Sequence, residues 1–300
     1  MFVEKIRIRI LLVRWIKTIF HISDLNLFLR DVRLYSSKFV YCKKFTVVDL
    51  VNLMCEMGMK PGSTIVIHCA MKQFYNFSGT AEELIDAIIE KLGPEGTLCM
   101  PSYPFDKKNE NILFDVIKSP TAAGYLAETF RKRKGVKRSL NKLHSVCAFG
   151  KYADYLINEH HLSKTCFDEK SPYYKLAKLN GLSFSLGLPK YYIGTIEHVC
   201  ESLLCNELGF FRDCFLKEVN FRYKDENQLE IYHKMWTCDR LYLRAHNSKL
   251  IDTYFDKEKF SRKRISNLRV SMFDVGYTVD RLVDLAMQGK TLYSYPKFYK

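Results

Sequence analysis

One segment of the chain alternates strand, helix and strand, and this pattern restricts the fold more than any other feature. Residues 63–67 form a short β-branched run that predicts a strand, and residues 96–100 are predicted to form a second strand. Between them, Thr80 and Glu83 make a capping box for a helix that runs to Lys91. Two strands joined by a helix in about 40 residues usually pair in parallel through a right-handed crossover. The sequence therefore predicts an α/β fold on a mainly parallel sheet.

Polar side chains follow both of these strands. His68 comes after the first strand, and Tyr103 and Asp106 come after the second. Ligands collect beyond the carboxyl ends of strands in such sheets. We therefore expect Tyr103 and Asp106 to bind substrate, whereas His68 is either a ligand contact or a satisfied structural histidine.

A candidate general base lies further along the chain. The apolar run of residues 182–188 predicts a buried strand, and Thr195 is a suitable N-cap that would make His198 the third residue of a helix. His198 and Glu201 are three residues apart, so both lie on one helix face. The helix N-terminus favours the neutral imidazole and Glu201 favours the charged one, which suits a proton acceptor. The alternative is a chance pair on a solvated surface.

A phosphate or pantetheine site is predicted at a second helix. Ser119, Pro120 and Thr121 resemble a helix N-terminus, and the helix would end with Gly135 as its C-cap. Six Lys or Arg residues lie within residues 131–138. Lys137 or Arg138 could bind a ligand phosphate, or the cluster could simply balance the helix dipole.

The net charge indicates the class of binding partner, and the cysteine pattern indicates the redox state of the thiols. The net charge of +14 and the pI of about 9.2 favour anionic partners. Ten cysteines without a metal-binding or disulfide pattern indicate reduced thiols in a cytoplasmic protein. Cys200 and Cys205 are interpreted as buried apolar residues rather than nucleophiles. The sequence has no apolar run long enough to span a membrane, and it suggests no metal site.

Residues 1–44 are predicted to be a separate basic extension, and residues 45–300 a catalytic domain. Apolar residues between 8 and 20 recur at helical spacing, and the first 45 residues carry ten Lys or Arg against three acids. Such a helix could contact an anionic membrane through residues 1–30, or it could pack on the body or on a second subunit. Near the C-terminus we predict strands at residues 229–235 and 240–244 and a helix at residues 279–287.

Together these landmarks resemble the aminoglycoside 3-N-acetyltransferase family over about residues 45–290, most densely between 61 and 205. Single motifs are weak, but their order and spacing are specific. In chain order they are residues 68–72 (HCAMK), 96–101 (GTLCMP), 114–115 (FD), 119–121 (SPT), 124–126 (GYL), 128–131 (ETFR), 135–139 (GVKRS), 144–145 (HS), 171–173 (SPY), 186–187 (LG), Thr195 and 198–201 (HVCE).

The resemblance implies a layered αβα fold on a mixed, largely parallel sheet, with acetyl-CoA as co-substrate. It also implies that His198 is the general base and Glu201 its partner. The acetyl-CoA contacts would be His68, Lys72, Ser119, Thr121, Arg138, His144 and Ser145. The chain departs from the family at Ala70, where a serine is usual, and at Asn141 and Lys142, where His-Pro is usual.

The acceptor and the activity both have alternatives. Because aminoglycosides are polycations, the net positive charge favours an anionic amino sugar linked to a nucleotide or lipid. The alternatives are an aminoglycoside-modifying resistance enzyme and an inactive binding or scaffold homologue. A nucleic-acid binder is disfavoured because no recognition element is present.

Overall fold

The computed structural model describes residues 32, 36–189, 192–238 and 248–293. The chain divides into two compact units, residues 1–44 and 45–300, and the elements below belong to the second. The helix predicted in residues 8–20, its membrane contact, and the strand predicted at residues 240–244 lie outside the described residues. Within the described residues, no helix has both the length and the apolar character needed to cross a bilayer.

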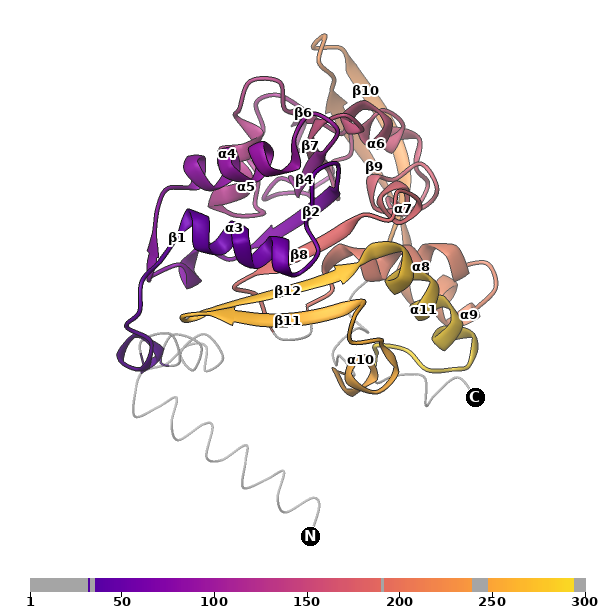
Figure 1. Ribbon diagram of the computed structural model, residues 1–300. Helices are drawn as coiled ribbons and strands as arrows, with labels where there is room; N and C mark the ends of the chain where they lie inside the picture. Colours follow the sequence, from indigo (N-terminus) through magenta and orange to yellow (C-terminus); the bar gives the residue numbers. More distant parts are fainter. Residues whose placement is uncertain (1–31, 33–35, 190–191, 239–247, 294–300) are drawn as a thin grey trace, which may run out of the picture. The chain divides into compact units, whose positions relative to one another are not determined.

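A seven-stranded sheet forms the centre of the second unit (Figure 1). In spatial order its strands are β11 (Phe260–Ile265), β12 (Leu268–Asp274), β8 (Leu182–Leu186), β2 (Thr64–Cys69), β4 (Thr97–Pro101), β7 (Val146–Gly150) and β6 (Lys137–Arg138). The three strands β8, β2 and β4 are parallel, and all other neighbours pair antiparallel. The sheet is mixed, as predicted, but its parallel part is smaller than expected because antiparallel strands flank it on both sides.

Helices cover both faces of this sheet. One face carries α3 (Val47–Glu56), α4 (Ala81–Leu92) and α5 (Tyr125–Arg131), and the other carries α6 (Ala153–Ile157), α7 (Pro172–Lys178), α8 (Glu197–Leu204) and α11 (Val275–Met287). Successive side chains of a strand point to opposite faces. In β2, Ile65 and Ile67 join the core under α3 to α5, whereas Val66 joins the core under the second group. This alternation confirms the layered αβα arrangement.

Two predicted helix caps, at the starts of α4 and α7, are present in the structure. The backbone N–H of Thr80 donates to Glu83 Oε2 (2.7 Å), and the N–H of Glu83 donates to Thr80 Oγ1 (3.1 Å), so the capping box is confirmed. Gly93 ends α4 with φ of 66°. Ser171 caps α7 by accepting from the Tyr174 N–H at 3.1 Å.

The helix start predicted at Ser119 is wrong, because α5 begins at Tyr125 after Gly124. The hydroxyl of Thr121 donates to the Tyr103 carbonyl (3.1 Å), and the hydroxyl of Ser119 accepts from the Asp115 N–H (3.0 Å). These bonds stabilise a turn instead of a helix. Gly135 is not the C-cap either, since α5 ends at Arg131 with Lys132 as its cap.

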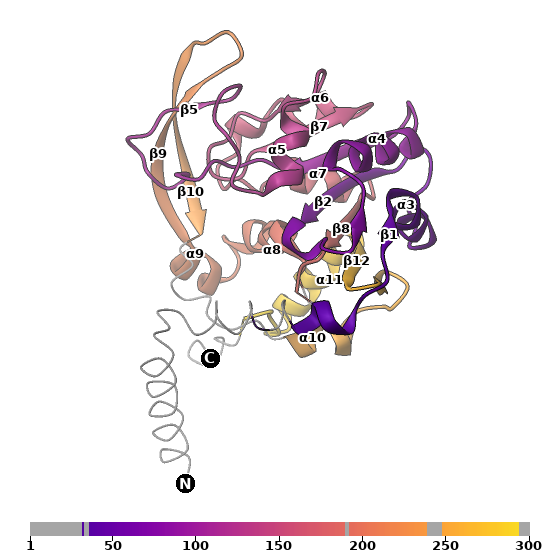
Figure 2. The same ribbon diagram turned by 90° about the vertical axis from the view of Figure 1, so that its left-hand side faces the viewer.

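A second sheet stands beside the first. Strands β9 (Leu216–Lys224) and β10 (Glu230–Cys238) form a long hairpin, and β5 (Phe114–Asp115) pairs with β9 in parallel (Figure 2). The strand predicted at residues 229–235 is thus confirmed as part of β10. The remaining elements are β1 (Phe45–Thr46), β3 (Phe77–Ser78), α9 (Gly209–Phe215), α10 (Ser248–Tyr254) and the 3₁₀ helices η1 (Met71–Gln73), η2 (His160–Leu162) and η3 (Gly194–Ile196).

Candidate active site

The candidate base lies where β8 passes into α8. Thr195 is part of η3, and α8 follows directly from Glu197 without a side-chain cap, so His198 is the second residue of the helix. The prediction that Thr195 caps this helix is therefore wrong. Its hydroxyl lies 3.2 Å from His68 Nε2, at the end of β2. A contact to a distant strand has replaced the local cap.

The structure brings His198 and Glu201 into direct contact. Nδ1 of His198 lies 2.8 Å from Oε2 of Glu201, and the two residues are only 2% and 6% exposed. A carboxylate can only accept, so Nδ1 carries the proton toward Glu201 and Nε2 holds the lone pair in the neutral ring. Oε1 of Glu197 lies 3.8 Å from this Nε2. The imidazole therefore has a carboxylate beside each of its nitrogens.

Aromatic rings enclose the imidazole of His198. Its centroid lies 5.0 Å from the ring of Phe167 and 6.3 Å from that of His144. Phe167 and His144 are themselves 4.6 Å apart, and Tyr103 lies 6.2 Å from His144. Three predicted site residues (Tyr103, His144 and His198) thus lie in one cluster. Phe167 was not predicted, because an isolated loop phenylalanine carries no sequence signal.

His68 contacts Thr195, three residues before His198. The electrostatic environment of its imidazole differs from that of His198. It is buried, and burial lowers the pKa of its imidazole to about 4. Its Nδ1 has no hydrogen-bond partner among the described residues. His68 is therefore a neutral polar group at physiological pH, suited to an amide or hydroxyl of a ligand rather than to a phosphate.

Arg138 and Ser145 support the turn after β4. The guanidinium of Arg138 donates to the carbonyls of Ser102 and Ser119, and the hydroxyl of Ser145 donates to the same Ser102 carbonyl at 2.8 Å. Arg138 is 6% exposed, and burial lowers its pKa to about 10, so it stays charged. Both residues have partners inside the protein, and their predicted acetyl-CoA contacts stay predictions.

The residues that depart from the family pattern have structural partners. Asn141 Oδ1 accepts from the N–H of Leu143 (3.1 Å) and of His144 (2.9 Å), which fixes the loop that carries His144. Lys142 is fully buried, and its ammonium donates to the carbonyls of Asn109 and Ile112. The unusual Asn-Lys pair thus stabilises this loop from within.

The basic cluster is ion-paired. Glu128 binds Arg131 and Lys132, Asp86 binds Arg133, and Asp154 lies 2.6 Å from Lys137. Four of the six basic residues thus have carboxylate partners within the protein, so these four need no ligand to balance their charge.

The remaining predicted contacts have different surroundings. Lys72 is exposed on η1, and Thr121 is buried against Tyr103. Asp106 and Ser119 line a separate hollow of about 130 Å³ with Lys142.

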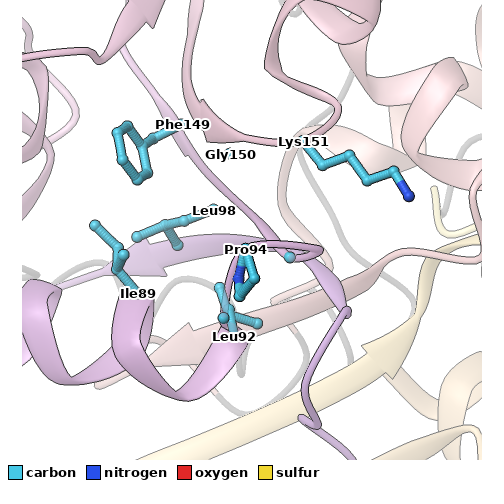
Figure 3. A pocket seen from close by; sticks show the side chains of 9 residues that line it. Ile89, Leu92, Pro94, Leu98, Phe149, Gly150 and Lys151 are labelled. Atoms are coloured by element: carbon cyan, nitrogen blue, oxygen red, sulfur yellow. The ribbon is translucent and has the colours of Figure 1, made fainter.

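An apolar hollow of about 280 Å³ lies at the far end of β4, away from the site (Figure 3). Ile89, Leu98 and Phe149 point into it, and Lys151 extends away from them. Leu98 is near the start of β4, whereas Ser102 and Tyr103 follow its end. This hollow is therefore not part of the cluster around His198.

The thiol of Cys200 adjoins Glu201 in the chain but is not activated. Cys200 is buried beside Glu201, and burial raises the pKa of its thiol, which disfavours the thiolate. Among the residues that the structure describes, no group of three or more His, Cys, Asp or Glu is placed to hold a metal ion.

Solved structures that superpose on this chain include aminoglycoside acetyltransferases. Aminoglycoside acetyltransferase AAC(3)-Xa superposes with a TM-score of 0.70 at 18% identity, covering 87% of this chain and 99% of that one. A structure described as AAC-IIIb binary with CoASH gives a TM-score of 0.69 at 18% identity, covering 84% and 100%. At such identities the likeness shows a shared fold.

Sequence comparison also finds relatives that are named as acetyltransferases or as acetyltransferase-like. Aminoglycoside N(3)-acetyltransferase IV of a Salmonella species is 26% identical over 172 residues, which are 55% of this chain and 62% of that protein. The YokD protein of Bacillus subtilis strain 168, an aminoglycoside N(3')-acetyltransferase-like protein, is 30% identical over 162 residues, 47% and 58% of the two chains. The chain thus matches about three fifths of the length of these curated relatives. The family model of aminoglycoside 3-N-acetyltransferases matches residues 66–286, and the chain belongs to that family.

Proposed function

We propose that this protein transfers the acetyl group of acetyl-CoA to an amine of an aminoglycoside-type amino sugar, with His198 as general base. The observation that carries the proposal is the buried contact of 2.8 Å between His198 Nδ1 and Glu201 Oε2. It orients the ring so that the lone pair on Nε2 can accept a proton. Membership of the family supports the class of reaction.

The chemistry needs such a base. An amine is mostly protonated at neutral pH, and only its free base attacks a thioester carbonyl. His198 Nε2 takes the proton that the amine loses as its nitrogen bonds to the acetyl carbon. The bond from that carbon to sulfur then breaks, and the imidazolium can return the proton to the departing thiolate. Glu201 stabilises the positive charge on the ring between these two steps.

Acetyl-CoA supplies the activated acetyl group, and the chain offers polar atoms that fit it. The buried Nδ1 of His68 has no partner among the described residues, which suits a ligand amide or hydroxyl. A neighbour of the same fold is described in complex with CoASH, which supports the co-substrate. We propose that His68, His144 and the exposed Lys72 contribute to this contact, together with Ser119 and Thr121.

The acceptor is better supported as a cationic amino sugar than as the anionic one expected from net charge. The side chains of Glu197 and Glu201 lie on opposite sides of the His198 imidazole, so the surroundings of the base are acidic although the chain carries +14. Local carboxylates attract ammonium groups. The Salmonella relative is named as an aminoglycoside acetyltransferase, which also favours this alternative.

The experiment is an acetyl-transfer assay with purified protein. Acetyl-CoA is offered with tobramycin, with gentamicin and with a nucleotide-linked amino sugar, and thiol release is followed with DTNB. We expect turnover of the aminoglycosides. Preference for the nucleotide-linked sugar would refute the acceptor class, and the absence of turnover with any amine would favour the inactive scaffold.

The matched variants test the base. His198→Ala should lower kcat by roughly 10²- to 10⁴-fold, while binding of CoA by calorimetry is retained. His161→Ala is the control, since His161 lies on η2 and is only half-buried. Wild-type turnover by the His198 variant would refute its role.

A further inference from the structure

We infer that Tyr293 is a positioning residue for the His198–Glu201 pair. This inference rests on the proposed catalytic role of that pair. The phenolic hydroxyl of Tyr293 donates to Oε1 of Glu201, while Oε2 of the same carboxylate bonds His198 Nδ1 at 2.8 Å. Both carboxylate oxygens are thus held. Tyr293 lies beyond the segment that the family model matches, which ends at residue 286.

The end of α11 directs the chain toward Glu201. α11 packs against α8, and Gly289 follows it with φ of 73°. The N–H of Gly289 donates to the Ala286 carbonyl (2.9 Å), and the N–H of Lys290 donates to that of Leu285 (2.8 Å). This is the bonding pattern of a Schellman motif. It turns the chain back from the helix end.

Two further contacts fix the tyrosine itself. Leu292 is 4% exposed and belongs to the core beneath α8 and α11. The Thr291 hydroxyl donates to the Tyr293 carbonyl (3.1 Å) and accepts from the Tyr293 N–H (3.3 Å). Tyr293 is 6% exposed. Its hydroxyl is therefore presented from a constrained backbone, and water has little access to the bond.

The hydroxyl favours one protonation state of the pair. A donor to the carboxylate stabilises Glu201 as an anion with the ring neutral, so losing that donor raises the proton affinity of the pair as a whole. The other titratable groups that face the pair among the described residues are Glu197 and Cys200 on α8 and His144 on the loop before β7. A phenylalanine at position 293 leaves all three unchanged.

The test variant is Tyr293→Phe, which keeps the ring and removes the hydroxyl. We expect the acid limb of the kcat/KM profile to move up by about one pH unit, because a hydrogen bond to a charged group is worth roughly that much. On the acid limb itself kcat/KM should therefore fall by up to about 10-fold, with KM for acetyl-CoA unchanged. The same shift should appear in an NMR titration of the His198 ring, which needs no turnover.

Two controls separate positioning from general packing. Tyr223→Phe removes a buried hydroxyl that has no hydrogen-bond partner among the described residues, and it should leave the profile unchanged. In a Glu201→Gln background, Tyr293→Phe should no longer move the NMR titration midpoint, because Tyr293 acts through the carboxylate. Should Tyr293→Phe fold poorly, Thr291→Val loosens the segment without touching the pair and should give a smaller shift in the same direction.

An unshifted titration midpoint in a folded Tyr293→Phe protein would overturn the inference. So would an equal shift in the Glu201→Gln background. A wild-type protein without turnover but with the expected NMR shift would refute the proposed function and leave the positioning role intact.

Discussion

Replacing Arg138 by alanine should destabilise the fold rather than only weaken acetyl-CoA binding. The guanidinium donates to the carbonyls of Ser102, Ser119 and, at 3.4 Å, Val116, and it stacks 4.6 Å from the centroid of Phe114. Truncation removes the Arg138 donor from all three carbonyls at a buried site, although the Ser102 carbonyl still accepts from the Ser145 hydroxyl. Each charged hydrogen bond contributes about 1 kcal/mol or more, and the ring contact adds about 1 kcal/mol. The expected loss is about 4 kcal/mol in the free energy of unfolding.

Urea denaturation followed by fluorescence measures this loss directly, and calorimetry measures CoA binding by the same variant. Lys137→Ala is the matched control, because Lys137 is the neighbouring cation and its side chain and that of its partner Asp154 are 47% and 59% exposed. An exposed pair contributes less than about 1 kcal/mol. An Arg138→Ala protein with wild-type stability and weakened CoA binding would refute the structural role. It would support the predicted contact between Arg138 and a ligand phosphate instead.

Two further predictions concern buried titratable groups. Burial lowers the pKa of His68 to about 4 and that of His160 to about 3. Since each unfolded imidazole binds its proton below about pH 6.5, stability should be complete above that pH and fall between about pH 6.5 and 3, by roughly 3 kcal/mol for His68. Urea titrations at several pH values check this, and His160→Gln should flatten the slope; an unchanged slope would contradict it. Cys200→Ala should retain kcat, because burial raises the pKa of this thiol, and loss of turnover would reopen thiol catalysis.

Two of the helix caps expected from local spacing are present in the structure. The capping box of Thr80 and Glu83 and the Ser171 cap were confirmed, because their partners lie within one turn. The His198–Glu201 contact is also local, since the two residues are three positions apart on α8. The order of motifs identified the family, which the family model shows.

Errors arose where a distant partner competes with the local one. Thr195 bonds His68 on β2 instead of capping α8, and Thr121 bonds the Tyr103 carbonyl instead of starting α5. A Ser or Thr hydroxyl can both donate and accept, so it can bond a distant partner as well as a local one. Sequence spacing therefore could not decide between them.

The sequence by itself determined the α/β class, the family and the helix face that carries the candidate base, because these depend on periodicity and short spacings. Only the tertiary structure decided that Arg138 supports a buried turn, that Phe167 and His144 enclose the imidazole, and that Tyr293 reaches Glu201 from 92 residues further along the chain. These contacts join segments that are distant in sequence. The packing of the whole chain brings these segments together, and no pattern within a single segment predicts which residues will meet.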